Sequence, residues 1–306
     1  MAETPSGWGL GQVAEGGRLA VRKTYKLYIG GKFPRTESGR SYLVSDARGR
    51  PLANACRGSR KDVRDAVRAA RTAFPGWAGL TAYNRGQVLY RIAEMLEGRR
   101  KQFVDEVASS EGASRRTAGD AVAKAIDRWV WYAGWADKID QVLGSANPVA
   151  GPYFNFSVPE PTGVVGLVAP ADSSLLGLVS RLAPIIVSGN SAVVLASQGR
   201  PLPAVTLAEV LATSDLPGGV VNLITGFTAE LVKPLAAHMD VNALDLAGLD
   251  LALLREVELA AADNVKRVTL PVRLAARDWL EDGKAQDPYW MAQFLEIKTV
   301  WHPAGV

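Results

Sequence analysis

The chain contains very few of the residues that build metal sites and covalent catalytic sites. Its 306 residues include one cysteine, Cys56, and two histidines, His238 and His302. A single cysteine excludes a disulfide within the chain and metal sites built on several thiolates, so we expect no metal. A hydrolase with a Ser-His-Asp triad is also disfavoured, because the sequence has no Gly-x-Ser-x-Gly stretch. His238 is better explained as a helix-end residue that interacts favourably with the helix dipole.

Long apolar runs and a strong charge of one sign are lacking as well. No apolar stretch reaches the length that a membrane crossing requires. Residues 1–17 lack the basic and then apolar pattern of a signal peptide. The formal net charge is only +4, and we interpret the basic runs at 57–61 and 97–101 as solvated helix ends. We therefore expect a cytoplasmic protein that binds neither membrane nor nucleic acid.

The N-terminal half predicts short hairpins followed by helices. We expect a flexible lead over residues 1–20 and a region of hairpins and helices over 21–150, with Gly-Gly and Asp46–Gly49 as the hairpin turns. Ser59 and Asp62 predict a capping box at the start of the first helix. Apolar spacing predicts two more helices, over 84–106 and 115–143.

Residues 161–270 alternate between apolar strands and helices, beginning with "GVVGLVA" at 163–169. Such alternation predicts right-handed crossovers and a parallel, doubly wound, Rossmann-like α/β sheet. Ligands of these sheets bind where the strands end, so a cofactor would lie near Pro170, Ala196, Gly226 and Gly248. Asp172 follows the first of these strands, and its simplest role is the N-cap of the next helix.

Two alternating stretches flank this core. Residues 151–160 predict an arm strand, and residues 271–306 predict a linker followed by a strand at the C-terminal end. Leu, Ile and Trp on an unpaired strand would favour aggregation in solvent, so we expect another chain to provide its sheet. The interface residues we expect are Tyr153, Phe154, Phe156, Phe294, Leu295, Ile297, Val300 and Trp301.

Eight stretches in the same order resemble the aldehyde dehydrogenase superfamily. They are "LYIGGKF", "DVRDAVRAARTAFPGW", "YAGWADKI", "PTGVVGLVAP", "LAPIIVSGNSAVVL", "DLPGGVVNLITG", "DNVKRVTL" and "FLEIKTVW". The resemblance implies a subunit with a nucleotide-binding domain, a catalytic domain and an oligomerisation arm that crosses to a neighbouring subunit. It also implies NAD(P)-dependent oxidation of an aldehyde through a cysteine thiolate and a glutamate base.

The sequence departs from the family at the positions that carry this chemistry. The family's Glu-Leu-Gly-Gly after "KRVTL" is replaced by Pro271 and the residues that follow it, and the catalytic domain is absent between there and the last strand. The family's Pro-Trp-Asn, whose asparagine helps form the oxyanion hole, is Pro170-Ala171-Asp172. A carboxylate there would repel a developing oxyanion. We therefore expect no catalytic residues.

The family's cofactor contacts are also reduced. The Lys-Pro pair that holds the adenosine ribose is Ala196-Ser197, and the turn beside the nicotinamide is Leu246-Ala247-Gly248-Leu249. Pro170, Gly226 and Gly248 keep the family's residue type and are the residual cofactor-binding candidates. NAD or NADP could still bind there, although any tight turn would use the same small residues.

Three hypotheses about the chain follow. The first is a catalytically inactive aldehyde dehydrogenase-like subunit, a pseudoenzyme, which pairs through its arm with a full-length aldehyde dehydrogenase or with itself. The second is an NAD(P)-binding oxidoreductase component of the same family that retains weak cofactor binding. The third is a decayed fragment without a role, which the clean patterning of the core positions disfavours.

Overall fold

A computed structural model describes residues 21–272 and 274–304, and its centre is a five-stranded parallel sheet. The strands are β6 (Val164–Val168), β7 (Ser191–Leu195), β8 (Val221–Ile224), β9 (Ala243–Asp245) and β10 (Arg267–Thr269). Their order is β10-β9-β6-β7-β8, and every neighbouring pair is parallel. The predicted doubly wound α/β fold is confirmed. The predicted lead, 1–20, lies outside the described residues.

Alternate side chains of the central strands point into two separate cores. Val164 and Val168 of β6 belong to one apolar cluster, whereas Val165 and Leu167 belong to another. Since successive strand residues point to opposite faces, both faces of the sheet are buried. This arrangement explains why the strands are almost entirely apolar.

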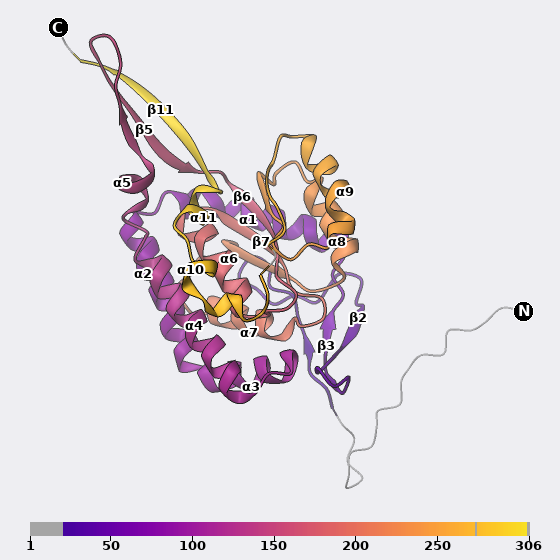
Figure 1. The fold of residues 1–306 in the computed structure, drawn as a ribbon. Helices are drawn as coiled ribbons and strands as arrows, with labels where there is room; N and C mark the ends of the chain where they lie inside the picture. Colours follow the sequence, from indigo (N-terminus) through magenta and orange to yellow (C-terminus); the bar gives the residue numbers. More distant parts are fainter. Residues whose placement is uncertain (1–20, 273, 305–306) are drawn as a thin grey trace, which may run out of the picture.

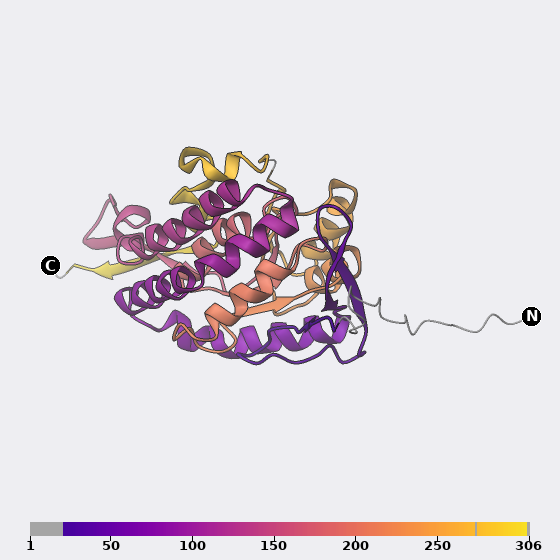
Figure 2. The same cartoon turned by 90° about the horizontal axis from the view of Figure 1, so that it is seen from below.

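Helices cover the two faces in unequal depth, as Figures 1 and 2 show. One face carries α6 (Leu176–Val187) and α7 (Leu202–Leu211), and the other carries α1 (Arg60–Ala78) and α8 (Thr228–Ala236), with α9 (Leu251–Ala262) beside α8. A further layer of α2 (Ala82–Gly98), α3 (Arg100–Glu111) and α4 (Arg115–Ala133) packs outside α6 and α7. Helix α6 is therefore buried on all sides.

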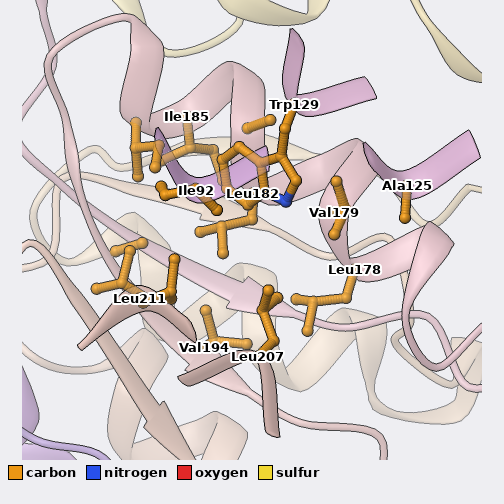
Figure 3. Packing of buried hydrophobic residues seen from close by; sticks show 14 of the residues in the cluster. Ile92, Ala125, Trp129, Leu178, Val179, Leu182, Ile185, Val194, Leu207 and Leu211 are labelled. Carbon is orange, nitrogen blue, oxygen red and sulfur yellow. The ribbon is translucent and has the colours of Figure 1, made fainter. Parts of the chain in front are cut away.

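The thicker side of the molecule holds the larger core. Figure 3 shows Trp129 from α4, Leu178 and Leu182 from α6, Val194 from β7 and Leu207 from α7 meeting in one apolar cluster. The sheet and the helices outside it are thus joined by direct packing of apolar side chains.

The N-terminal predictions were mostly confirmed. Strands β2 (Ser41–Ser45) and β3 (Pro51–Cys56) form the predicted hairpin, and β1 (Thr24–Tyr25) adds to β3 in parallel. Gly30 and Gly31 make the other predicted turn with positive φ angles, between the bridged residues Ile29 and Lys32. Ser59 and Asp62 form the predicted capping box.

The lengths of two predicted helices were wrong. The helix predicted over 84–106 is divided at Arg99. The Arg99 guanidinium forms an ion pair with Glu209 on α7, with Nη2 and Oε2 2.6 Å apart. The helix predicted over 115–143 ends at Ala133 and resumes as the short α5 (Ile139–Leu143). Tertiary contacts of this kind override the local apolar spacing on which the predictions depended.

The arm is a separate three-stranded sheet that extends away from the body (Figure 1). It contains β4 (Ser145–Asn147), β5 (Tyr153–Pro161) and β11 (Leu295–Pro303), with β5 in the middle. Strands β5 and β11 pair antiparallel over their full length, from Leu295 opposite Pro161 to Pro303 opposite Tyr153. The expectation of an unpaired terminal strand was therefore wrong, because β5 of the same chain satisfies one of its two edges.

A compact linker connects the sheet to the arm. After β10 the chain forms a 3-10 turn, η1 (Asp278–Leu280), and two single-turn helices, α10 (Asp282–Ala285) and α11 (Tyr289–Ala292). Among the described residues, these three short elements are the only helices or strands between β10 and β11. No helix within residues 21–272 and 274–304 is both long enough and apolar enough to cross a membrane.

The shared core predicts a large cost for cavity formation in α6. Leu182→Ala removes most of a side chain that is 1% exposed, and we expect it to lower the free energy of unfolding by about 2–5 kcal/mol. Leu259→Ala on α9 is the matched control, because that leucine is 65% exposed and should change stability by less than about 0.5 kcal/mol. Urea denaturation of both variants measures the difference, and equal losses would contradict the packing described here.

Candidate functional site

The carboxyl ends of the sheet strands enclose a polar cleft of about 450 Å³. From β6 the chain adds β7 and β8 on one side, and then β9 and β10 on the other side of β6. Open α/β sheets bind their ligands at such a switch in strand order, here between β6 and β9. The cleft is lined by residues that follow β6, β7 and β9, by the first turn of α8, and by the β2–β3 hairpin: Ser45, Asp46, Ala47, Ser110, Ala169, Ala171, Ser197, Gln198, Gly199, Arg200, Thr228, Ala229, Gly248, Asp250 and Leu253. Its position is the one predicted for a nucleotide.

Gly248 lies at the floor of this cleft for a reason that involves no ligand. A side-chain carbon added there would overlap the carbonyl oxygen of Ala169 and come within 2.8 Å of the backbone nitrogen of Pro170. The Gly248 amide also donates a hydrogen bond to Val168 O at 2.9 Å. Glycine is therefore required because two strand-end turns touch at the point where a ligand would otherwise enter.

Gly226 and Pro170 also have structural roles. Gly226 has a φ of +151° that favours glycine, and a side-chain carbon there would be 3.1 Å from the amide nitrogen of Gly58. Pro170 packs against Gly177 of α6, where an added side-chain carbon would lie 3.1 Å from the proline ring. Of the three predicted cofactor residues, only Gly248 lines the cleft, and contacts within the chain account for the residue type at all three positions.

At the starts of α8 and α9, one backbone amide is already hydrogen-bonded to a side chain. At the start of α8, the Thr228 amide donates to Gln198 Oε1 at 3.3 Å. At the start of α9, the Ala252 amide donates to Asp250 Oδ1 at 3.0 Å. Phosphate binding at a helix start depends on free N–H groups, so each of these helix starts has one donor fewer than an uncapped helix would have.

Aromatic and charged side chains pack against one another beside the start of α8. Phe227 stacks on Tyr42 with ring centroids 5.4 Å apart, and the Arg57 guanidinium lies 4.5 Å from the Phe227 ring centroid while pairing with Glu230. Burial raises the pKa of the Tyr42 hydroxyl, which donates to Gln198 O at 3.2 Å. Large side chains therefore pack directly after Gly226, where α8 begins.

Charge in the cleft also opposes a dinucleotide. Burial acts against ionisation of Asp46, but hydrogen bonds from the Arg50 and Arg48 amides and from the Arg50 side chain outweigh it, so the pKa of Asp46 is lowered. The one cationic lining residue among those described, Arg200, is turned to the carbonyl oxygens of Ala171 and Asp172, at 3.3 and 3.1 Å. The residues present do not fit the NAD(P) that the resemblance implies.

The predicted capping role of Asp172 is wrong. Helix α6 begins at Leu176, and its cap residue Leu175 makes no side-chain cap hydrogen bond. Ser173 takes a related role, because its hydroxyl accepts from the Gly177 amide at 2.9 Å. Helix α6 starts three residues later than Asp172 would need, and in the preceding turn Ser174 donates to Glu111 Oε1 through both its amide and its hydroxyl.

The family's catalytic pair has no counterpart among the described residues that line the cleft. Cys56 ends β3, is 2% exposed, and packs among apolar side chains of the core between α1 and the sheet. Reactive thiolates need an exposed and electropositive environment, which this position does not provide. Where the family has its glutamate, the chain turns into the linker.

Two buried arginines hold that linker against α4 and α6, and the sequence analysis missed both. The Arg128 guanidinium donates to Ser180 Oγ at 2.9 Å, to the carbonyl oxygen of Ala285, and to Asp282 Oδ1 at 3.2 Å. Arg181 pairs with Asp245 at 2.7 Å, with both side chains almost fully buried. Neither gave a signal in the sequence, because Arg181 is a single arginine in an apolar helix and Arg128 is one of several charged residues in α4.

The predicted interface residues divide into three groups. Tyr153, Ile297 and Trp301 share one face of the arm, where the Tyr153 and Trp301 rings meet edge to face at 5.8 Å. Phe154, Phe156 and Val300 share the other face, where the two phenylalanine rings lie 5.3 Å apart. Tyr153, Phe154, Ile297 and Trp301 are 46–59% exposed.

Phe294 and Leu295 do not belong with the exposed arm residues. They are 0% and 3% exposed and complete the main core beneath the arm. The Phe294 carbonyl oxygen accepts from Asn190 Nδ2 at 2.8 Å and from the Thr162 amide at 3.2 Å. These two residues fix the root of β11 to the body, so their side chains are unavailable to a partner.

Comparison with known proteins places this geometry in a family. The model described as "Aldehyde dehydrogenase family" matches residues 34–272. Putative aldehyde dehydrogenase DhaS of Bacillus subtilis (strain 168) is 31% identical over 255 residues, which cover 82% of this chain and 50% of that protein. The mitochondrial aldehyde dehydrogenase family 2 member B4 of Arabidopsis thaliana is 33% identical over 249 residues, covering 80% and 46%.

A solved structure agrees with the sequence relatives. The crystal structure of HpcC from Thermus thermophilus has a TM-score of 0.77 and 31% identity, and the match covers 81% of this chain and 48% of HpcC. The chain spans about half the length of the curated relatives that it matches.

The packing of Gly248 predicts a stability defect at the cleft floor. Gly248→Ala should lower the free energy of unfolding by about 3 kcal/mol, because the new methyl group overlaps the end of β6. Gly199→Ala is the matched control, since Gly199 lines the same cleft with open space around it. Thermal unfolding compares the two, and an unchanged melting temperature for Gly248→Ala would contradict the structural role.

Proposed function

Because the chain belongs to the aldehyde dehydrogenase family, we propose that it is a catalytically inactive member, a pseudoenzyme. In this proposal it is a cytoplasmic subunit that associates through its arm with a full-length aldehyde dehydrogenase and acts as a scaffold or regulator. The oxidoreductase chemistry of the assembly then belongs to the partner.

The observation that carries the proposal is the exposed arm. Strand β11 has nine residues, and among the described residues it pairs on one edge only. The other edge presents backbone N–H and C=O groups to solvent, beside the exposed side chains of Ile297 and Trp301. Edges of this kind favour pairing with a strand from another chain, so β-strand addition to a partner sheet is the simplest use of the arm.

Contacts at the base of β11 fix the arm in one orientation relative to the body. Leu295 and Phe294 are buried in the body, and the Arg267 guanidinium pairs with Glu296 through two hydrogen bonds of 2.7 and 2.6 Å. Lys298 pairs with Glu160 across the two strands at 3.0 Å. The arm thus has a defined direction before any partner binds, which lowers the entropic cost of association.

The cleft supports the loss of dehydrogenase chemistry. A thiolate nucleophile and a carboxylate base must both reach the reacting carbon. The described lining contains no thiol, and its two carboxylates, Asp46 and Asp250, each accept from backbone amides of their own turns. Asp172 follows β6 where an oxyanion donor would be needed, and a carboxylate cannot donate a hydrogen bond when ionised.

A second candidate function is a family member that retains weak NAD(P) binding. The observation that favours it is the 450 Å³ cleft at the expected edge of the sheet, with Arg200 in its lining. A cleft of this size is large enough for part of a dinucleotide. The two candidates differ in whether the nucleotide binds at all.

Removing the exposed apolar arm residues should release the partner. We expect a full-length aldehyde dehydrogenase to co-purify with the tagged chain from its native cells, and Ile297→Lys with Trp301→Lys to reduce its recovery at least tenfold. Both positions are exposed in the isolated chain, so the double variant should fold normally. Quantitative mass spectrometry of the purified complex measures recovery.

Leu259→Lys on α9 controls for a general effect of surface charge, because Leu259 is equally exposed and lies away from the arm. Recovery that falls equally in this control, or a chain that elutes alone or only with copies of itself, contradicts the pairing with an aldehyde dehydrogenase.

Nucleotide titration separates the two candidate functions. We expect isothermal titration with NAD and with NADP to give the same heats for the chain and for Arg200→Gln, because the Arg200 guanidinium is already bonded to the carbonyl oxygens of Ala171 and Asp172. Saturable binding that is lost in Arg200→Gln would favour the second candidate instead.

A further inference from the structure

Four arginines form a ridge along one side of α1. Arg60, Arg64, Arg68 and Arg71 are spaced by four, four and three residues, which places them on one helical face. Residues four apart are separated by about 6 Å along the helix axis. Beyond the basic run at 57–61, the ridge is not apparent as a charge cluster in the sequence, because its arginines are separated by two or three other residues.

The first half of the ridge forms one wall of a groove on the surface of the described part of the chain. The groove has a volume of about 850 Å³ and lies between α1 and the C-terminal end of α8. Arg60, Lys61 and Arg64 stand on the α1 wall, and Lys233 and His238 stand on the α8 wall. Every ionisable lining residue is basic. The remaining lining residues are apolar: Val63, Pro234, Ala237 and Met239.

The carboxylates around the groove neutralise it only in part. Lys61 pairs with Glu37, Arg64 with its neighbour Asp65, and Lys233 with Glu256, all through exposed side chains at 2.6–3.0 Å. Exposed pairs of this kind contribute about 0–1 kcal/mol and exchange readily with other partners. The guanidinium groups of Arg60 and Arg68 have no hydrogen bond or ion pair within the described residues.

Without an anion, this arrangement is unfavourable for α1. Arg60 and Lys61 lie in the first turn, where the helix dipole disfavours positive charge. Arg60 and Arg64, like Arg64 and Arg68, are like-charged pairs four residues apart, which destabilise a helix. Burial lowers the pKa of His238, and the cations of Lys266, Arg68 and Arg71 lower it further, while the carboxylate of Asp240 acts in the opposite direction.

We propose that the groove between α1 and α8 binds a small organic anion that carries two or more phosphate groups. Arginine guanidinium groups bind phosphate oxygens in pairs, and lysine adds a point charge from the opposite wall. The apolar floor would contact the organic part of the ligand, and the groove volume is in the range of small-molecule sites. The proposal is independent of the proposed function, because neither the arm nor the cleft contributes to the groove.

Isothermal titration with inorganic pyrophosphate and with ADP tests the site, with adenosine as the uncharged comparison. We expect saturable binding of both anions and none of adenosine. Arg60→Gln with Arg64→Gln should weaken both anions at least tenfold, and Lys233→Gln on the opposite wall should weaken them at least threefold. Arg91→Gln with Arg100→Gln is the matched control, since both are exposed helix arginines away from the groove, and it should change neither affinity.

Three results would overturn the proposal. The first is an absence of saturable pyrophosphate or ADP binding at low salt. The second is binding that the control variant weakens as much as the groove variants do, or ADP binding that the groove variants leave unchanged, which would indicate the strand-end cleft. The third is tighter, groove-dependent binding of a polyglutamate peptide than of either phosphate compound, which would assign the groove to an acidic polypeptide.

Discussion

A buried ion pair between α6 and β9 determines how the linker after β10 packs against the body. Arg181 and Asp245 are 1% and 0% exposed, with Nε and Oδ2 2.7 Å apart. Such a pair is stable only when the remaining donors and acceptors are also satisfied. The second carboxylate oxygen accepts the Ala247 amide, and the guanidinium donates to Gln293 and stacks on Trp290 of the linker. The linker is therefore part of the core, and the direction of the arm follows from it.

Most of the architecture could be predicted from the sequence because it rests on local signals. Apolar strands such as Ser191–Leu195 and the helices between them predicted the doubly wound sheet, and the Ser59 capping box was confirmed. The errors came from contacts between distant residues. The break at Arg99 depends on Glu209, and the pairing of β11 with β5 places Thr299 opposite Ser157, 142 positions away. Neither partner can be inferred from a local pattern.

The position of the cleft could be predicted from the sequence, but the side-chain and backbone contacts around it could not. Topology placed it at the strand ends, whereas the contacts that fill it come from remote segments: Gln198 against the start of α8, Tyr42 from the hairpin and Ala169 beneath Gly248. Residue type alone therefore could not distinguish a glycine that approaches a cofactor from one that approaches its own backbone. The α1 arginine ridge is the opposite case, because the helical spacing of its four arginines can be read from the sequence alone.

The central claim is that the folded body serves as a binding subunit through the open edge of β11. Hydrogen–deuterium exchange of the β11 amides, in the isolated chain and in the complex purified from native cells, tests it most directly. The account predicts that alternate amides of Glu296–His302 exchange rapidly in the isolated chain and become protected in the complex, while the Leu295 root is protected in both. Equal exchange of β11 in the two states would contradict it.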